Sequence, residues 1–178
     1  MRKIVIVCGL IAGSIVTAMM VITVAACYKN ENFDGSEALG YATMVIAFSM
    51  IFVGIKSYRD KHSNGVISFG KAFRIGLYIS LIASTLYVVV WLVDYYMFVP
   101  DFMDKYAAHV MREAKAGGAT QAEMDSQLKQ METYKALYKN PLMVILMTYA
   151  EILPVGLIIS LISALILKRK MKPGIEPA

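Results

Sequence analysis

The chain has 178 residues, of which 58% are hydrophobic and only 17% are charged, and its net charge is +5. Soluble domains are about 45–50% apolar and about 25% charged, so the composition argues against a soluble protein. The charged residues lie between apolar blocks, so a membrane explains the basic balance better than nucleic acid does. We therefore expect a lipid bilayer as the partner and no nucleic acid.

Four apolar blocks predict four transmembrane helices, at about residues 4–27, 38–55, 72–98 and 142–167. A bilayer core needs about 20 apolar residues per helix, and each block reaches or approaches that length. The fold class expected is an all-α integral membrane protein, with residues 1–178 forming a single membrane domain.

The first block has a second interpretation. Arg2 and Lys3 before an apolar run resemble the start of a signal peptide, and residues 24–27 (VAAC) resemble a lipoprotein box with Cys27 as the lipidated residue. A signal peptide has an apolar core of about 7–15 residues, whereas this block is longer. We expect the first span to be retained, with processing at Cys27 as the alternative.

Basic residues alternate between the segments that join the spans. They cluster at the N-terminus, in the loop between the second and third spans and in the C-terminal tail, whereas the first loop is acidic and residues 99–141 hold six basic and six acidic residues. Cytoplasmic loops carry the excess of Lys and Arg. The pattern predicts that both termini and the loop between the second and third spans are cytoplasmic.

Small residues recur at four-residue spacing in three of the spans: Gly9 and Gly13; Ala72, Gly76, Ser80 and Ser84; Gly156, Ser160 and Ala164. Such stripes let helix backbones approach closely in lipid. We expect them to pack inside one four-helix bundle. The alternative is an interface with a second copy or another membrane protein.

The long third loop predicts a helical hairpin over about residues 101–139, outside the cytoplasm. Apolar residues recur there at helical spacing on both sides of Gly117 and Gly118. Thr120 and Glu123 match a capping box, in which the first residue caps a helix and the acid reaches back to it. The two helices would pack on each other along an apolar seam, and the alternative is that they lie on the membrane surface as interfacial helices.

Aromatic residues gather at the outer ends of the spans: Tyr28, Tyr41, Trp91, Tyr95, Tyr96 and Phe98. Such residues form belts at membrane interfaces, and we place Trp91 and Asp94 there. An aromatic ligand-binding box is the alternative.

The loop between the second and third spans carries a recognisable pattern. Residues 53–61 (VGIKSYRDK) lead through Asn64 and Gly65 to residues 67–76 (ISFGKAFRIG). A Gly-Ile-x-x-Tyr-Arg-Asp segment followed by Gly-x-Ile-x-Phe-Gly-x-Ala-Phe is similar to the bacterial membrane family called domain of unknown function 4199. The similarity extends to the span order and the long third loop. It implies the same architecture and a bacterial inner-membrane location, and it implies no catalytic roles because the family has no established activity.

The same loop contains candidate docking residues for a cytoplasmic partner or a lipid phosphate: Tyr58, Arg59, Asp60, Lys71 and Arg74. Basic residues beside a span also fix its orientation and meet anionic headgroups. That simpler role accounts for the charges but not for the Tyr-Arg-Asp order.

Glu151 is the acid that the sequence places deepest in a span, about 13 Å along its helix. Acids inside a bilayer are rare and count as functional candidates. Thr17, Ser49 and Tyr87 lie at the same expected depth and are its predicted hydrogen-bond partners. A structural acid, a proton or ion pathway and a simple cavity-facing side chain are the three interpretations.

Other chemistry has little support. His109 and Glu113 could share one helix face, but we expect that face to be solvated and no metal to bind. The chain has no Walker loop, nucleophile elbow or zinc-protease motif, and we expect no cofactor. The leading function is a non-enzymatic accessory or scaffold protein. The alternatives are a small transporter or channel-like oligomer that uses Glu151, and an enzyme on lipid-linked substrates at the outer interface.

Overall fold

The computed structural model describes residues 1–30, 33 and 36–169. Within these residues the chain is all-helical, with six α-helices, one short π-helix and no strand. In chain order the elements are α1 (Arg2–Asn30), α2 (Ser36–His62), α3 (Phe69–Val93), η1 (Asp94–Phe98), α4 (Phe102–Ala116), α5 (Gln121–Tyr138) and α6 (Pro141–Leu167).

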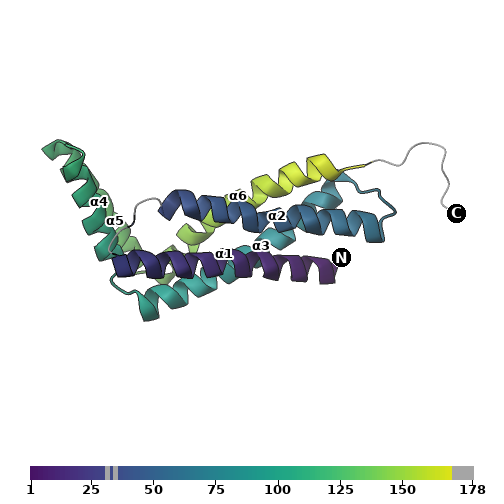
Figure 1. The fold of residues 1–178 in the computed structure, drawn as a ribbon, viewed down its shortest axis with the longest axis horizontal. Coiled ribbons are helices and arrows are strands. Elements are labelled where there is room, and N and C mark those ends of the chain that lie inside the picture. The colour runs from purple at the N-terminus through teal and green to yellow at the C-terminus, as the bar shows by residue number, and fades with distance from the viewer. Residues whose placement is uncertain (31–32, 34–35, 170–178) are drawn as a thin grey trace.

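Four of the helices lie side by side, while α4 and α5 project from one end, which we call the α4–α5 end (Figure 1). The opposite end, where α1 begins and α6 finishes, is called the terminal end. Four stretches are long and apolar enough to cross a membrane, namely Arg2–Lys29, Ala38–His62, Phe69–Phe98 and Pro141–Leu167. The prediction of four apolar spans is confirmed, and the helices continue beyond the predicted limits into their polar flanks.

The outer faces of these four helices are apolar. Ile46 of α2 and Ile166 of α6 are each 65% exposed, and Ile22 of α1 is 61% exposed. Contiguous apolar surface of this kind is rare on soluble monomers and common where a protein meets another apolar phase. The exposed faces, like the helix lengths, indicate a membrane protein.

The centre of the bundle is α3, which packs against α1, α2 and α6. Its crossing with α6 is reciprocal, because Gly76 faces Ser160 and Gly156 faces Ser80. The two serine Oγ atoms are 3.2 Å apart and both are buried. The small-residue stripes of α3 and α6 therefore meet inside this bundle.

Gly9 and Gly13 of α1 also face inward. A Cβ atom added at Gly9 would lie 2.8 Å from Cβ of Ile82, and one added at Gly13 would lie 3.1 Å from Cα of Ala83. Both neighbours belong to α3, so this pair of glycines serves the packing of α1 on α3.

The segment predicted to be helical after the third span contains α4 and α5, which contact each other. Between them Gly118 has φ of +77°, a left-handed conformation that glycine adopts without strain. The capping box is confirmed: the Thr120 N–H donates to Glu123 Oε2 at 2.7 Å, and the Glu123 N–H donates to Thr120 Oγ1 at 3.4 Å. Hydrogen bonds from Thr120 hold the pKa of Glu123 below its usual range.

One expectation for α4 is wrong. His109 does not lie on a solvated face but is only 9% exposed. Phe33 covers it, with the two ring centroids 5.5 Å apart, and Glu113 Oε2 lies 3.7 Å from His109 Nε2. Sequence spacing placed the pair on one helix face, but it could not reveal that Phe33 packs against His109 there.

At the terminal end, the loop between α2 and α3 is tied to the end of α6. Backbone groups of Ile67 and Arg169 exchange two hydrogen bonds, of 2.9 and 3.2 Å. Asn64 and Gly65 both have positive φ, as expected for a turn, and Ser68 caps α3 by accepting from the Lys71 N–H. This network holds the loop against the bundle.

Candidate functional site

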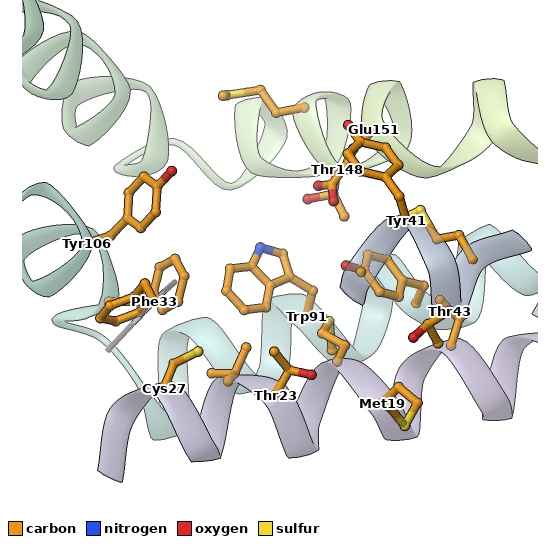
Figure 2. Close-up of a pocket in the computed structure, with 18 of the residues that line it drawn as sticks. Met19, Thr23, Cys27, Phe33, Tyr41, Thr43, Trp91, Tyr106, Thr148 and Glu151 are labelled. Carbon is orange, nitrogen blue, oxygen red and sulfur yellow. The ribbon is translucent and has the colours of Figure 1, made fainter. Parts of the chain in front are cut away.

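A cavity of about 460 Å³ lies at the α4–α5 end, between the adjoining ends of the four long helices and the α4–α5 pair. All six α-helices and Phe33 contribute to its wall. Figure 2 shows Thr148 and Glu151 reaching from α6 toward Trp91, while Met19, Thr23 and Cys27 approach from α1. The space is therefore bordered by parts of the chain that are far apart in sequence.

The wall of the cavity consists mainly of aromatic and methionine side chains. The aromatic members are Phe33, Tyr41, Tyr87, Trp91, Phe102, Tyr106, Tyr134 and Tyr138. The methionines are Met19, Met20, Met44, Met103, Met131 and Met147. Apolar pockets with a few polar groups are typical of small-molecule sites, whose volumes are about 300–1,000 Å³.

The polar side chains of the wall differ in their hydrogen bonding and exposure. Thr43 and Thr148 donate their hydroxyl hydrogens to carbonyls of their own helices, to Leu39 at 2.8 Å and to Val144 at 2.7 Å. Glu151 lies one turn beyond Thr148 at the border of the buried stripe of α6, and its side chain is exposed. Its carboxylate is thus positioned to meet a molecule in the cavity.

Glu151 lies close enough to two phenols to act on them electrostatically, those of Tyr87 and Tyr138. Burial raises the pKa of Tyr138 to about 12, and the nearby Glu151 carboxylate adds to that shift. The Tyr138 phenol is consequently neutral at physiological pH, and it can serve as a hydrogen-bond donor or acceptor beside the acid.

The roof of the cavity is an aromatic cluster between α3, α4 and the loop after α1. Phe102 packs edge-on against Trp91 and Phe33, with centroid distances of 5.3 and 5.7 Å, and Phe33 packs edge-on against Tyr106 at 5.9 Å. Such pairs each contribute about 0.5–1.5 kcal/mol beyond their buried area. The cluster fixes α4 over the bundle.

Polar contacts tie the same roof to α1. The Tyr28 hydroxyl donates a hydrogen bond to Asp101, and Lys105 Nζ lies 3.9 Å from the centroid of the Tyr28 ring. The hydrogen bond from Tyr28 holds the pKa of Asp101 below its usual range. Asp101 is therefore ionised at neutral pH and remains an acceptor for Tyr28 and an ion-pair partner for Lys105.

Of the four residues predicted to form an intramembrane polar site, two lie in the cavity wall and two lie elsewhere. Glu151 and Tyr87 both line the cavity. Ser49 is exposed on the outer face of α2, where its hydroxyl donates to the Ile46 carbonyl at 2.6 Å. Thr17 is buried in α1 and is not part of the cavity wall.

The residues predicted at the outer interface are also divided. Trp91 is 8% exposed and forms part of the cavity wall, as does Tyr41. Asp94 lies outside the wall and begins the π-helix η1, whose wide turn leaves Tyr95 buried and Phe98 exposed. Some aromatic residues of this end therefore line the cavity, and others lie on the outer surface of the bundle.

The candidate docking residues gather at the terminal end. Tyr58 is buried, stacks on His62 at 5.5 Å and has Lys71 Nζ 5.2 Å from its ring centroid. Arg59 pairs with Asp60 at 2.7 Å. Arg74 is exposed on α3. Tyr58 thus contributes to packing and Arg59 is partly buried, while Asp60, Lys71 and Arg74 are exposed.

Several residues of the cavity wall carry no sequence motif, among them Gly40, Phe33 and the six methionines. One signal was available: methionines and aromatic residues are concentrated near one end of the predicted spans and in the third loop. Among the described residues, no group of three or more His, Cys, Asp or Glu side chains could hold a metal ion.

Comparisons with known proteins place the chain in a family. No curated protein and no solved structure matches it. Residues 8–169 match the family described as "Protein of unknown function (DUF4199)". Because this match covers most of the 178 residues, the chain belongs to that family.

Proposed function

We propose that the protein is a non-enzymatic membrane protein that binds an apolar molecule in the cavity at the α4–α5 end. The observation that supports it is the cavity itself, which has a volume of about 460 Å³ and a wall of aromatic and methionine side chains. Methionine fills irregular space and adapts to different contact surfaces. Such a protein would serve as an accessory component that captures or presents its ligand.

Two other functions receive less support. An enzyme at the outer interface would need convergent polar groups near Asp94 and His109, and neither residue belongs to the cavity wall. A transporter would need a polar passage through the bilayer that reaches Glu151. The described part of the chain has a cavity on one side of Glu151, which would form part of such a passage, so transport is the second candidate. Because four spans make a small permeation unit, a transporter would require an oligomer.

The test is to fill the cavity without disturbing the packing. Gly40 belongs to the cavity wall, and a Cβ atom added there would meet no atom within 4 Å. We expect Gly40→Phe to weaken binding of the neutral fluorescent probe N-phenyl-1-naphthylamine about tenfold or more, since the ring would occupy the ligand's space. Energy transfer from Trp91, the single tryptophan of the chain, measures binding in dodecyl maltoside micelles.

A matched control is Gly70→Phe. Gly70 also has nothing within 4 Å of an added Cβ atom, but it lies at the opposite end of the bundle in the first turn of α3. This variant should bind the probe as the wild type does. Equal binding by both variants, or no energy transfer in the wild type, would refute the proposed function.

The orientation is part of the same proposal: a bacterial inner membrane, with the terminal end in the cytoplasm and α4 and α5 outside. The basic clusters of the terminal end support it. In a background with Cys8 and Cys27 replaced by Ser, a membrane-impermeant maleimide should label Ser126→Cys on α5 in intact cells and should not label Gly70→Cys until the cells are opened. Both substituted residues are exposed, so the reverse pattern would mean the opposite orientation.

A further inference from the structure

The cavity wall contains an acidic residue. Among the described residues that line it, Glu151 is the carboxylate, and Lys, Arg and His are absent. When ionised, Glu151 places a negative charge beside aromatic and methionine side chains. A cationic ligand would be attracted by this charge, whereas an anionic one would be repelled.

Aromatic rings occur beside the acid. Tyr87 and Tyr138 lie within electrostatic reach of Glu151, and Trp91 belongs to the same wall. Aromatic faces attract cations, tryptophan most strongly, and quaternary ammonium groups are recognised by such rings elsewhere. A carboxylate and several rings that converge on one space therefore favour a cation that also has apolar substituents.

The size and composition of the cavity limit the cation further. A small inorganic ion would leave most of the space of about 460 Å³ unfilled and would lose its hydration shell against apolar groups. The six methionines have flexible, polarisable side chains that can adapt to the shape of an organic ligand. These properties favour a bulky organic cation.

We propose that the cavity binds a lipophilic organic cation, with Glu151 as its counter-charge and Trp91, Tyr87 and Tyr138 as its aromatic surroundings. This inference rests on the proposed function, because it specifies which class of apolar molecule the cavity takes. Glu151 is a ligand-binding residue in this arrangement.

The test is displacement of bound N-phenyl-1-naphthylamine by two ions of similar size and opposite charge, tetraphenylphosphonium and tetraphenylborate. We expect tetraphenylphosphonium to displace the neutral probe from the wild type. In Glu151→Gln, the concentration needed for half displacement should rise about tenfold, as expected for loss of one partly buried ion pair. Displacement by tetraphenylborate should become easier in that variant, and each half-displacement concentration is corrected for the variant's own affinity for the probe.

Two further variants make the comparison specific. Glu132→Gln removes the same charge from an exposed position on α5 outside the cavity wall, and it should change displacement by less than about twofold because exposed charges are screened. Glu151→Asp keeps the charge and should retain the preference for the cation. If Glu151→Gln does not fold, Glu151→Ala takes its place, and loss of the preference in Glu151→Ala with its retention in Glu151→Asp and Glu132→Gln would support the proposal.

The outcomes separate this inference from the proposed function. If the neutral probe binds but Glu151→Gln leaves displacement by tetraphenylphosphonium unchanged, the cation inference is overturned and the cavity still binds apolar molecules. The same conclusion follows if Glu132→Gln has as large an effect as Glu151→Gln. If the probe does not bind to the wild type at all, both the proposed function and the cation inference are overturned.

Discussion

Replacing Gly156 by Ala should destabilise the bundle by about 1–3 kcal/mol, because the added methyl group overpacks the crossing of α3 and α6. Its Cβ atom would lie 2.8 Å from Ser80 Oγ, 2.9 Å from Ser80 Cβ and 3.1 Å from Phe48 Cζ. Both neighbours are fully buried, so neither can move aside without disturbing other contacts. Unfolding by sodium dodecyl sulfate in mixed micelles, followed by circular dichroism, measures the change.

A second substitution tests the cause. Ser80→Gly removes the Cβ and Oγ atoms that the new methyl group would meet, so Gly156→Ala combined with Ser80→Gly should be more stable than the sum of the two single changes indicates. Gly70→Ala is the control, because an added Cβ atom meets nothing within 4 Å there. A Gly156→Ala variant as stable as Gly70→Ala would show that the α3–α6 crossing is not packed as described.

Replacing Trp91 by Ala should lower the free energy of unfolding by about 3–5 kcal/mol, as large-to-small changes of buried aromatic residues do. Trp91 is 8% exposed and contacts Tyr95 and Phe102, so its indole joins α3 to α4. Its loss would also enlarge the neighbouring cavity. Besides lower stability, we expect faster hydrogen exchange in α4, because Phe102 would lose its edge-on partner.

The matched control for Trp91→Ala is Phe98→Ala. Phe98 is an aromatic residue at the same end of the bundle, but it is 69% exposed, so its removal should have little effect on packing. Trp91→Phe keeps a ring in place and should recover much of the loss. Equal stability of Trp91→Ala and Phe98→Ala would contradict the role assigned to the indole.

The sequence by itself determined the four long apolar helices and their approximate limits. Each block approaches or exceeds the thickness of a bilayer core, and that property depends only on local composition. The same holds for the capping box at Thr120 and Glu123, the turn at Asn64 and Gly65 and the cap at Ser68, since each is decided by residues close together in the chain. The motifs around the second loop also identified the family.

Only the tertiary structure decided which face of each helix looks inward. A span that is apolar all round has no polar face to mark its outside, so periodicity does not predict its rotation. That rotation puts Tyr41 and Trp91 into the cavity wall and leaves Ser49 on the outer surface. It likewise brings Glu151 and Tyr87 to one cavity and leaves Thr17 and Ser49 outside the cavity wall.

The tertiary structure also decided what the long third loop does. Its apolar periodicity predicted a seam between two helices, yet many of the seam residues, including Phe102, Met103 and Tyr138, line the cavity. Phe33, from a loop 69 residues before Phe102, completes the roof. Contacts between such distant segments depend on the docking of whole helices, which no local pattern encodes, and this is why the span count could be predicted and the binding cavity could not.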